Sequence, residues 1–381
     1  MRRKISVRIF YTLLLSIVCS VNAPCSVSDS LHVIHYNINI ENINFTLHTI
    51  KASCSVTIQA KQNNVSAIPL SLLELTVDSV KINGSSMVFS YNDTTLIIPA
   101  PSPMQLNDSL TADIYYHGAP VTDASGWGGF YFSSTHAFNM GIGFAADPHN
   151  YGKAWFPCID EFTDHSIYDF YITTASNHKA FCNGILAGSV VNPNNTVTWH
   201  WQMNQPIASY LASIAVSNYY TLKCTSNNIN IEWACTVSDT PAVLNTFQHV
   251  DTILSSFITA YGPYPFDKVG FILVPFNSGA MEHATSIHIG TAYMSGLTYE
   301  TIWAHELSHM WWGDKVTCET AGDMWLNEGF ASFNEAFMTE KVYGAVAYKN
   351  WLRINNKLVL QFAHIVDGNY LPLINVPHDY T

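Results

Sequence analysis

The chain has 381 residues, of which 48% are hydrophobic and 12% are charged, and its formal net charge is −12. This length exceeds one ordinary domain core and predicts at least two domains, while the composition excludes collagen-like and disordered proteins. Because no segment rich in Lys and Arg follows the first eight residues, the charge pattern argues against a nucleic-acid partner.

The N-terminus has the features of a cleaved secretory signal peptide over residues 1–23. Basic residues lie within the first eight positions, an apolar segment runs from Ile9 to Val18, and small residues follow at Ser20 and Ala23. The apolar segment is too short to span a bilayer. We therefore expect a secreted, periplasmic or cell-surface protein with no membrane span beyond the signal peptide, and an uncleaved anchor is the alternative.

Short segments that alternate apolar and polar residues occupy the chain from about residue 30 to 220. Examples are "HVIHYNINI", "CSVTIQA" and "NTVTWHWQM", and turn-rich joints such as "NGSS" separate them. Regularly spaced segments of this kind predict an antiparallel β-sandwich or barrel.

Two cysteines in the following region, Cys224 and Cys235, flank the polar segment "TSNNIN". A secreted chain permits disulfides, so this pair is a candidate to bridge a hairpin. Cys158 and Cys318 are expected to be buried free thiols.

The pattern changes after about residue 240. Apolar residues recur at three- and four-residue steps from Ala242 to Gly262, which predicts one helix. A strand over residues 268–276 follows, then a helix that ends at Gly313 and a further helix that ends near Gly344. A β domain is therefore expected to precede an α+β domain.

The segment "WAHELSHMWWGD" contains His305, Glu306 and His309 in the pattern H-E-x-x-H. On a helix the two histidines lie one turn apart on the same side, so both imidazoles can bind one ion. Glu306 is rotated by about 100° from His305, which lets it reach a water on that ion as a general base. The motif also occurs by chance, and the histidines are then ordinary core or surface residues.

A catalytic zinc site requires a third protein ligand and leaves the fourth position for water. Glu328 in "WLNEGFA" is the candidate, because the eighteen residues that separate it from His309 allow a turn and a second helix packed against the first. Asp323, near the start of that helix, is either a helix cap or a hydrogen-bond acceptor behind a metal ligand.

Upstream, "FNSGAMEHAT" follows the predicted strand and carries Glu282 among small and apolar residues. Gly279 and Ala280 leave room for an extended peptide to pair along this edge. Glu282 then meets the cationic amine at the end of that peptide. The alternative is an ordinary surface glutamate at a strand end.

These motifs together resemble the zinc aminopeptidase N family of gluzincins, which includes the leukotriene hydrolase. The family pattern is G-x-M-E-N, then H-E-x-x-H, eighteen residues and E, and "GAMEH", "HELSH" and "WLNEG" follow it in order. The segment "YGKAWFPCIDEF" also resembles a block of the family's β domain. The resemblance spans roughly residue 30 to the end of the sequence, in a bacterial-like GAMEH variant.

The resemblance implies a multidomain fold, with an N-terminal saddle-shaped antiparallel β-sandwich over residues 24–218. An α+β thermolysin-like zinc peptidase domain over residues 219–381, incomplete at its C-terminal end, would follow. The implied roles are one Zn²⁺ per chain held by three ligands, a base that activates the zinc-bound water, an anchor for the substrate amine, and a substrate-positioning edge. The zinc ligands would be His305, His309 and Glu328, and the base would be Glu306. The amine anchor would be Glu282, and the positioning edge would be Gly279, Ala280 and Met281.

Three departures from the family pattern stand out. His283 replaces the Asn of the first motif and is expected to alter substrate preference, and Phe162 replaces a Pro in the β-domain block. The family's Tyr, which donates a hydrogen bond to the oxyanion, has no matching segment, and Tyr380 does not fit that role. The chain is therefore expected to be a fragment.

The predicted function is that of a zinc metalloaminopeptidase acting on peptides with a free N-terminus. One alternative is a zinc- and peptide-binding protein with little or no activity because the oxyanion Tyr is missing. An endopeptidase, in which Glu282 binds no amine, is another alternative. An epoxide hydrolase side activity, known in one branch of the family, is the last.

Overall fold

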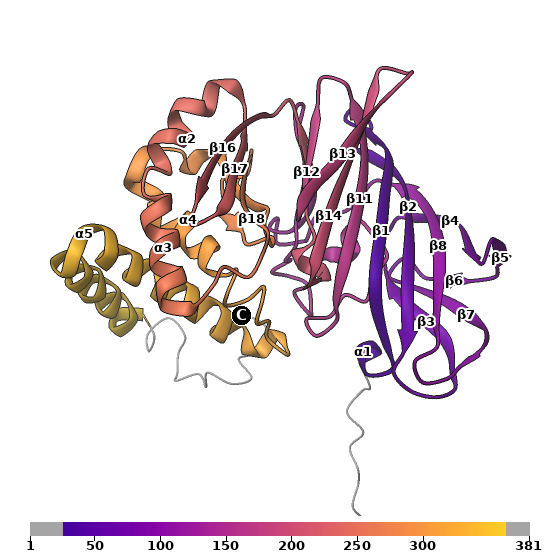
Figure 1. Cartoon of the computed structure of the whole chain (residues 1–381). Helices are drawn as coiled ribbons and strands as arrows, with labels where there is room; N and C mark the ends of the chain where they lie inside the picture. The colour runs from indigo at the N-terminus through magenta and orange to yellow at the C-terminus, as the bar shows by residue number, and fades with distance from the viewer. Residues whose placement is uncertain (1–25, 363–381) are drawn as a thin grey trace, which may run out of the picture.

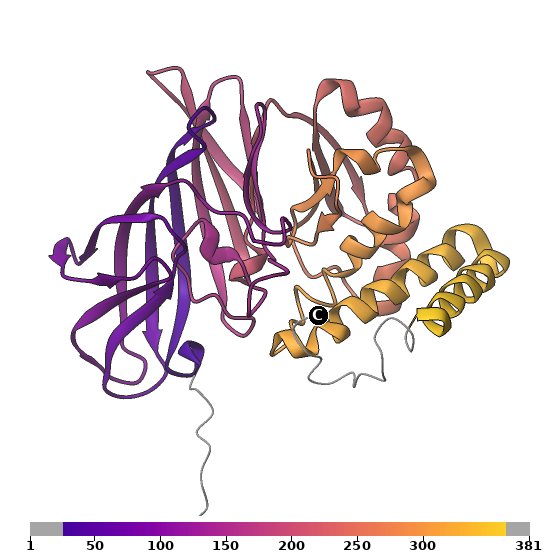
Figure 2. The ribbon, with the colours of Figure 1, turned by 180° about the vertical axis from the view of Figure 1, so that it is seen from behind.

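The computed structural model describes residues 26–362 as two domains that lie side by side. A β-rich N-terminal domain, indigo to magenta in Figure 1, packs against a domain with helices on its outer side, shown in orange and yellow. Figure 2 shows the same arrangement from behind. The predicted signal peptide and Tyr380 lie outside the described residues. Within residues 26–362, no helix is both long and apolar enough to cross a membrane.

The N-terminal domain begins with a one-turn helix, α1 (Val27–Ser30), and its main sheet has eight strands. All neighbouring pairs are antiparallel except β1 and β11, which run parallel. In spatial order the strands are β13 (Ile185–Asn192), β14 (Thr196–Ala208), β11 (His165–Ala175), β1 (Leu31–Asn44), β2 (Thr49–Ala60), β8 (Ser109–Gly118), β4 (Thr76–Ile82) and β5 (Ser85–Met87).

Strand β1 shows how the sequence pattern places this sheet against its core. Leu31 and Val33 point inward, a register shift follows between Val33 and His35, and the inward positions then continue at Tyr36 and Ile38. A bulge inserts one extra residue, so the inward side chains fall on odd-numbered positions before it and on even-numbered positions after it.

Two smaller sheets complete the N-terminal domain. They are the sheet β3 (Val65–Ser71), β7 (Thr95–Met104), β6 (Ser90–Tyr91) and the sheet β12 (Lys179–Cys182), β15 (Ile214–Ser217), β10 (Ala137–Met140), β9 (Gly129–Phe132). The second of them lies toward the other domain, because Asn183, directly after β12, donates to Ala284 O.

The second domain follows β15 and contains a mixed five-stranded sheet. Its spatial order is β16 (Tyr220–Ser226), β17 (Ile229–Cys235), β18 (Lys268–Val274), β20 (Ile287–Gly290) and β19 (Ala280–Met281), so β19 is an edge strand. Its helices are α2 (Thr240–Thr246), α3 (Val250–Tyr261), α4 (Glu300–Ser308) and α5 (Met324–Phe362). Gly344 interrupts α5 with a φ of 84°, where the sequence predicts a helix end.

The single helix predicted from Ala242 to Gly262 is wrong, because the chain leaves helical geometry between α2 and α3. Phe247 turns into the core and packs 5.1 Å from the Trp303 ring, and His249 Nδ1 lies 2.7 Å from Glu300 Oε1. These tertiary contacts override the local periodicity. Helix α4 likewise ends at Ser308 rather than Gly313, and Asp314 N then donates to His309 O at 2.9 Å.

The predicted disulfide between Cys224 and Cys235 is also wrong. The hairpin of β16 and β17 does form, but its register places Cys224 opposite Ile231 and Cys235 opposite Tyr220. Both thiols are free. Cys158 is buried and free as expected, whereas Cys318 is free but only half-buried.

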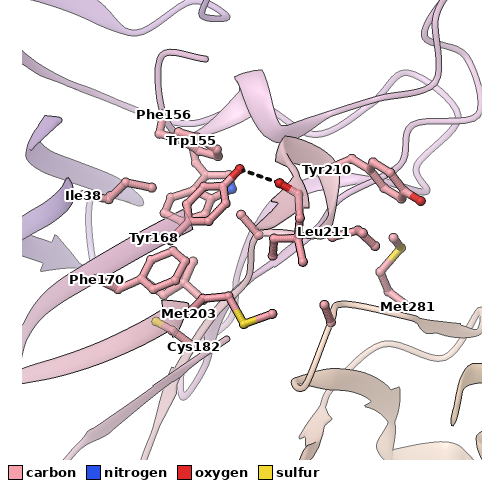
Figure 3. Close-up of a cluster of buried hydrophobic side chains, with 14 of the residues drawn as sticks. Ile38, Trp155, Phe156, Tyr168, Phe170, Cys182, Met203, Tyr210, Leu211 and Met281 are labelled. Atoms are coloured by element: carbon pink, nitrogen blue, oxygen red, sulfur yellow. Dashed lines mark hydrogen bonds between the residues drawn. The ribbon is translucent and has the colours of Figure 1, made fainter. Parts of the chain in front are cut away.

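A continuous apolar core joins the two domains. Tyr168, Phe170 and Leu211 of the N-terminal domain belong to the buried cluster in Figure 3, and Met281 reaches this cluster from the edge strand β19. Tyr168 Oη donates to Ile207 O at 3.5 Å within it.

Polar contacts complete this junction, which we call the domain seam and define as residues 283–286 with the N-terminal residues they touch. Asn183 Nδ2 donates to Ala284 O at 2.7 Å, and Gly184 N donates to Thr285 Oγ1 at 2.6 Å. Residues 283–286 are fully buried. The segment after β19 is therefore closed off from solvent by the neighbouring domain.

Candidate metal and substrate site

Three predicted ligands meet at the junction of α4 and α5. His305 lies in the last turn of α4, His309 follows at its C-cap, and Glu328 is the fifth residue of α5. His305 Nε2 lies 3.2 Å from Glu328 Oε2, and His309 Nε2 lies 4.0 Å from the same oxygen. One candidate ligand atom from each residue lies within 4.8 Å of the others.

This donor set fits zinc. Zinc–nitrogen and zinc–oxygen distances of about 2.0–2.2 Å in a tetrahedron place neighbouring ligand atoms about 3.4 Å apart, and the two distances from Glu328 Oε2 to the histidine Nε2 atoms, 3.2 Å and 4.0 Å, bracket this value. Burial alone would raise the pKa of Glu328, but the hydrogen bond with His305 and the charge of both histidines lower it to about 2. Glu328 is therefore an anion, the form that binds a metal.

Hydrogen bonds hold both imidazoles in place from behind. His305 Nδ1 donates to Glu335 Oε1 at 3.0 Å, and His309 Nδ1 donates to Asn327 Oδ1 at 2.6 Å and to Trp312 O at 3.0 Å. These partners leave both Nε2 atoms available to one ion, which is the usual arrangement of histidine ligands.

Glu335 and Asn327 are two site residues that the sequence motifs did not predict. Glu335 lies seven residues after Glu328 on the same face of α5, and this spacing was the available signal. The hydrogen bond that Asp323 Oδ2 makes is neither of the two predicted for this residue, because it accepts from Thr320 Oγ1, at 2.8 Å.

Two further glutamates line the cavity that adjoins the three ligands. The cavity has a volume of about 460 Å³, and Glu306 and Glu282 are both buried in its wall. Burial raises the pKa of Glu306 well above its ordinary value, and burial also raises the pKa of Glu282. A carboxylate with a raised pKa is a stronger base, and a buried carboxylate favours a cationic partner.

The edge strand β19 forms one side of this cavity. Ala280 and Met281 pair antiparallel with Ile289 and His288 of β20, and Gly279 precedes them with a φ of 147°. The opposite edge of β19 faces the cavity, and Gly279, Ala280 and Met281 all line it. The structure thus brings every predicted site residue to one cavity.

The N-terminal domain supplies the remaining wall, which sequence analysis did not find. Trp127, Ile142, Phe144 and His149 line the cavity from loops around β9 and β10. The available signals were the Gly-rich segment around Trp127 and an aromatic residue, Phe144, in the segment "GIGFAADP". Neither carries a spacing that predicts contact with residues 150 positions further along the chain.

His283 does not line the cavity, and its effect on substrate preference stays a prediction. It is fully buried in the domain seam, where its Nε2 donates to Asn139 O at 3.2 Å. Burial lowers its pKa to about 4. Phe162, the other departure, packs edge-on against Tyr210 with ring centroids 5.3 Å apart.

Family models match both domains in the order in which they occur. The peptidase M1 N-terminal domain matches residues 32–211, and the peptidase family M1 domain matches residues 246–367. The chain belongs to peptidase family M1. This membership confirms the resemblance to the aminopeptidase N family and the predicted two-domain fold.

Curated M1 relatives are longer than this chain. Leukotriene A-4 hydrolase of Xenopus laevis is 23% identical over 327 residues, which cover 83% of this chain and 53% of that protein. Aminopeptidase N of Canis lupus familiaris is 30% identical over 269 residues, covering 63% and 26%, and human endoplasmic reticulum aminopeptidase 1 is 27% identical over 258 residues, covering 62% and 26%. The chain thus spans from about a quarter to about half of the length of these relatives.

Solved M1 structures share the fold. A mutant M1 zinc metallopeptidase from Deinococcus radiodurans bound to a Tyr-Ser-Ala substrate matches with a TM-score of 0.78 at 19% identity, covering 93% of this chain and 81% of that one. A two-domain M1 zinc metallopeptidase mutant bound to L-tryptophan matches with a TM-score of 0.70 at 20% identity, covering 83% and 74%. Both are described as zinc enzymes, and the ligand set found here fits the same ion.

Proposed function

We propose that this chain is a zinc aminopeptidase, which hydrolyses the first peptide bond of peptides that have a free N-terminus. The observation that carries the proposal is the position of Glu282. It lies in the same cavity as the three zinc-binding side chains and Glu306, at the point where the cavity meets the buried domain seam. Export through the predicted signal peptide is part of the proposal.

The zinc ion, when bound, supplies polarisation of the scissile carbonyl and lowers the pKa of water. Glu306 follows His305 on α4 and lines the same cavity. It accepts a proton from the attacking water and passes it to the nitrogen of the leaving amine. The raised pKa that burial gives Glu306 suits both transfers.

Glu282 selects the chain end by charge and by space. Its buried carboxylate pairs with the α-ammonium of the first residue through a charge-assisted hydrogen bond. Residues 283–286 beyond it are fully buried against the N-terminal domain, so no further substrate residue fits past Glu282. Only the first peptide bond then reaches the zinc ligands.

The test compares chromophore release from an aminoacyl substrate and its N-acetyl form by the zinc-loaded protein and by Glu282→Ala. We expect cleavage of the free-amine substrate only, and a loss of about 10- to 100-fold in kcat/KM in the variant, from the loss of a hydrogen bond to a charged group. Glu340→Ala on α5, outside the cavity lining, is the matched control. Equal cleavage of both substrates would instead indicate an endopeptidase.

A second candidate function is zinc and peptide binding with little turnover. Within residues 26–362, the residues that line the cavity include no tyrosine, so no phenol there donates to the oxyanion. Loss of one such donor costs about 10²–10³ in kcat. Stoichiometric zinc binding with no release from either substrate would favour this candidate.

A further inference from the structure

Trp127 of the N-terminal domain contacts the catalytic domain directly beside the substrate edge. Its indole Nε1 donates to Ser278 O at 3.1 Å, two residues before Ala280. Its ring stacks on Phe144 with centroids 4.7 Å apart and meets Phe276 edge-on at 5.5 Å. Trp127 also lines the cavity, so one side chain contacts both the strand and the space that a substrate would fill.

A buried carboxylate fixes the position of this tryptophan. Asp123 Oδ2 accepts hydrogen bonds from Ser125 N and from Ala145 N, each at 2.9 Å. These bonds tie the loop that carries Trp127 to the segment that carries Phe144. Trp127 N in turn donates to Ser125 Oγ at 3.1 Å. The indole is thus held by its own loop before it contacts the second domain.

The direction of the backbone groups in β19 follows from one hydrogen bond. Gly290 N donates to Gly279 O at 3.3 Å, so the carbonyl of Gly279 faces β20. Because main-chain groups alternate along an antiparallel pair, the N–H and C=O of Ala280 point to the opposite side, toward the cavity. Ser278 precedes the strand, and its carbonyl points toward Trp127, which lines the cavity. The indole of Trp127 therefore already donates a hydrogen bond to one of the carbonyls on the cavity side of this edge.

The direction of a bound peptide is set by the seam. With the amine at Glu282, the chain cannot continue past the buried residues 283–286 and must run back along β19, antiparallel to it. If the first residue lies beside Met281, the second lies opposite Ala280 and the fourth lies opposite Ser278. The second residue of the peptide meets the N–H and C=O of Ala280, which face the cavity. The fourth residue meets the carbonyl of Ser278, which already accepts a hydrogen bond from Trp127.

We propose that Trp127 is a positioning residue of the substrate edge, which holds Ser278 and limits main-chain pairing with β19 to the second residue of the peptide. The proposal rests on the proposed function, in which Glu282 anchors the amine. Trp127 orients the backbone that leads into Ala280, and its indole N–H competes with the N–H of a fourth residue for the Ser278 carbonyl.

Binding to zinc-loaded Glu306→Gln protein, measured by calorimetry, tests this without turnover. The ligands are an aminoacyl methyl ester, which has no N–H at the second position, a tripeptide, a tetrapeptide, and the tetrapeptide with an ester in place of the amide before its fourth residue. We expect Trp127→Phe, added to this background, to weaken tripeptide binding about three- to tenfold, the effect of one lost hydrogen bond, and to leave binding of the aminoacyl methyl ester unchanged. We expect the amide and ester tetrapeptides to bind the Glu306→Gln protein equally.

The control is Trp199→Phe, which also loses an indole hydrogen bond, here to Thr174 Oγ1 at 3.0 Å on the main sheet. Trp199→Phe should change the affinity neither for the one-residue ligand nor for the tripeptide. Equal weakening of the one-residue and three-residue ligands by Trp127→Phe would overturn the proposal, because a merely structural role affects both. A tetrapeptide amide that binds much more tightly than its ester would also overturn it, and that comparison requires no change at Trp127.

Failure of the proposed function gives a different result. If N-acetylated ligands bind as tightly as free ones, Glu282 does not anchor the amine. The comparison of ligand lengths is made within the free-amine series, so the two failures are distinguishable.

Discussion

Two histidine pairs in this molecule have nearly the same ring geometry and opposite surroundings. His305 and His309 have ring centroids 4.8 Å apart at 71°, and His283 and His288 have centroids 4.6 Å apart at 71°. The first pair lies at a cavity with a carboxylate between its Nε2 atoms. The second pair is buried against the N-terminal domain, with His283 in the domain seam and His288 in β20, and both rings donate to one acceptor, Asn139 O, at 3.2 Å and 2.9 Å.

The difference shows that the neighbours, rather than the spacing of two imidazoles, decide what they do. Glu328 and Glu335 surround His305 with negative charge and favour a cation there. His283 has only neutral partners, and burial keeps its pKa low. The first pair can therefore hold a metal ion, whereas the second connects two domains.

The largest effect is expected from a substitution that removes the proposed base and leaves His305 and His309 in place. Glu306→Gln should lower kcat by about 10²–10⁴, the usual contribution of a general base, while zinc content stays at one per chain. Steady-state kinetics and metal analysis on the same preparation measure both. Retention of more than a tenth of the activity would show that another group takes the proton.

A smaller effect is expected from the acceptor behind His305. Glu335→Gln keeps the size of the side chain but removes its charge, and we expect zinc affinity to fall about 10- to 100-fold, as is typical for such partners. Competition with a chelating dye measures the affinity. Glu340→Gln, on the same helix but outside the metal group, is the control, and an equal loss in both variants would contradict a specific role for Glu335.

The buried ring of His283 should make the free energy of unfolding depend on pH. Burial lowers the pKa of His283 to about 4 from its ordinary value of 6.5, so the unfolded chain takes up the proton first as the pH falls. Stability is then lost between about pH 6.5 and 4, by at most about 1.4 kcal/mol per pH unit.

Denaturant unfolding of the metal-free protein measures this slope. His283→Asn lacks the titrating ring and should show a shallower loss over the same range, since all other groups are shared. Parallel curves for the two proteins would mean that His283 titrates alike in both states.

Local chemistry was predictable from the sequence, and contacts between distant segments were not. His305 and His309 follow from the helical repeat, and Glu328 follows from its distance along the chain, so the structure finds the three side chains together. Trp127 carries no comparable signal, because its contact with Ser278 depends on how two domains pack. The break at Phe247 escaped prediction for the same reason, since a tertiary contact decides it.

The edge strand and the seam have one further consequence. Residues 283–286, which follow Glu282, are covered by Asn183, Gly184 and their neighbours on the other domain. In the proposed function, selectivity for a chain end is thus a property of domain packing rather than of the residues proposed to perform hydrolysis. Evolution or engineering that loosened this packing would open the closed end of the cavity and turn the same metal centre toward internal bonds.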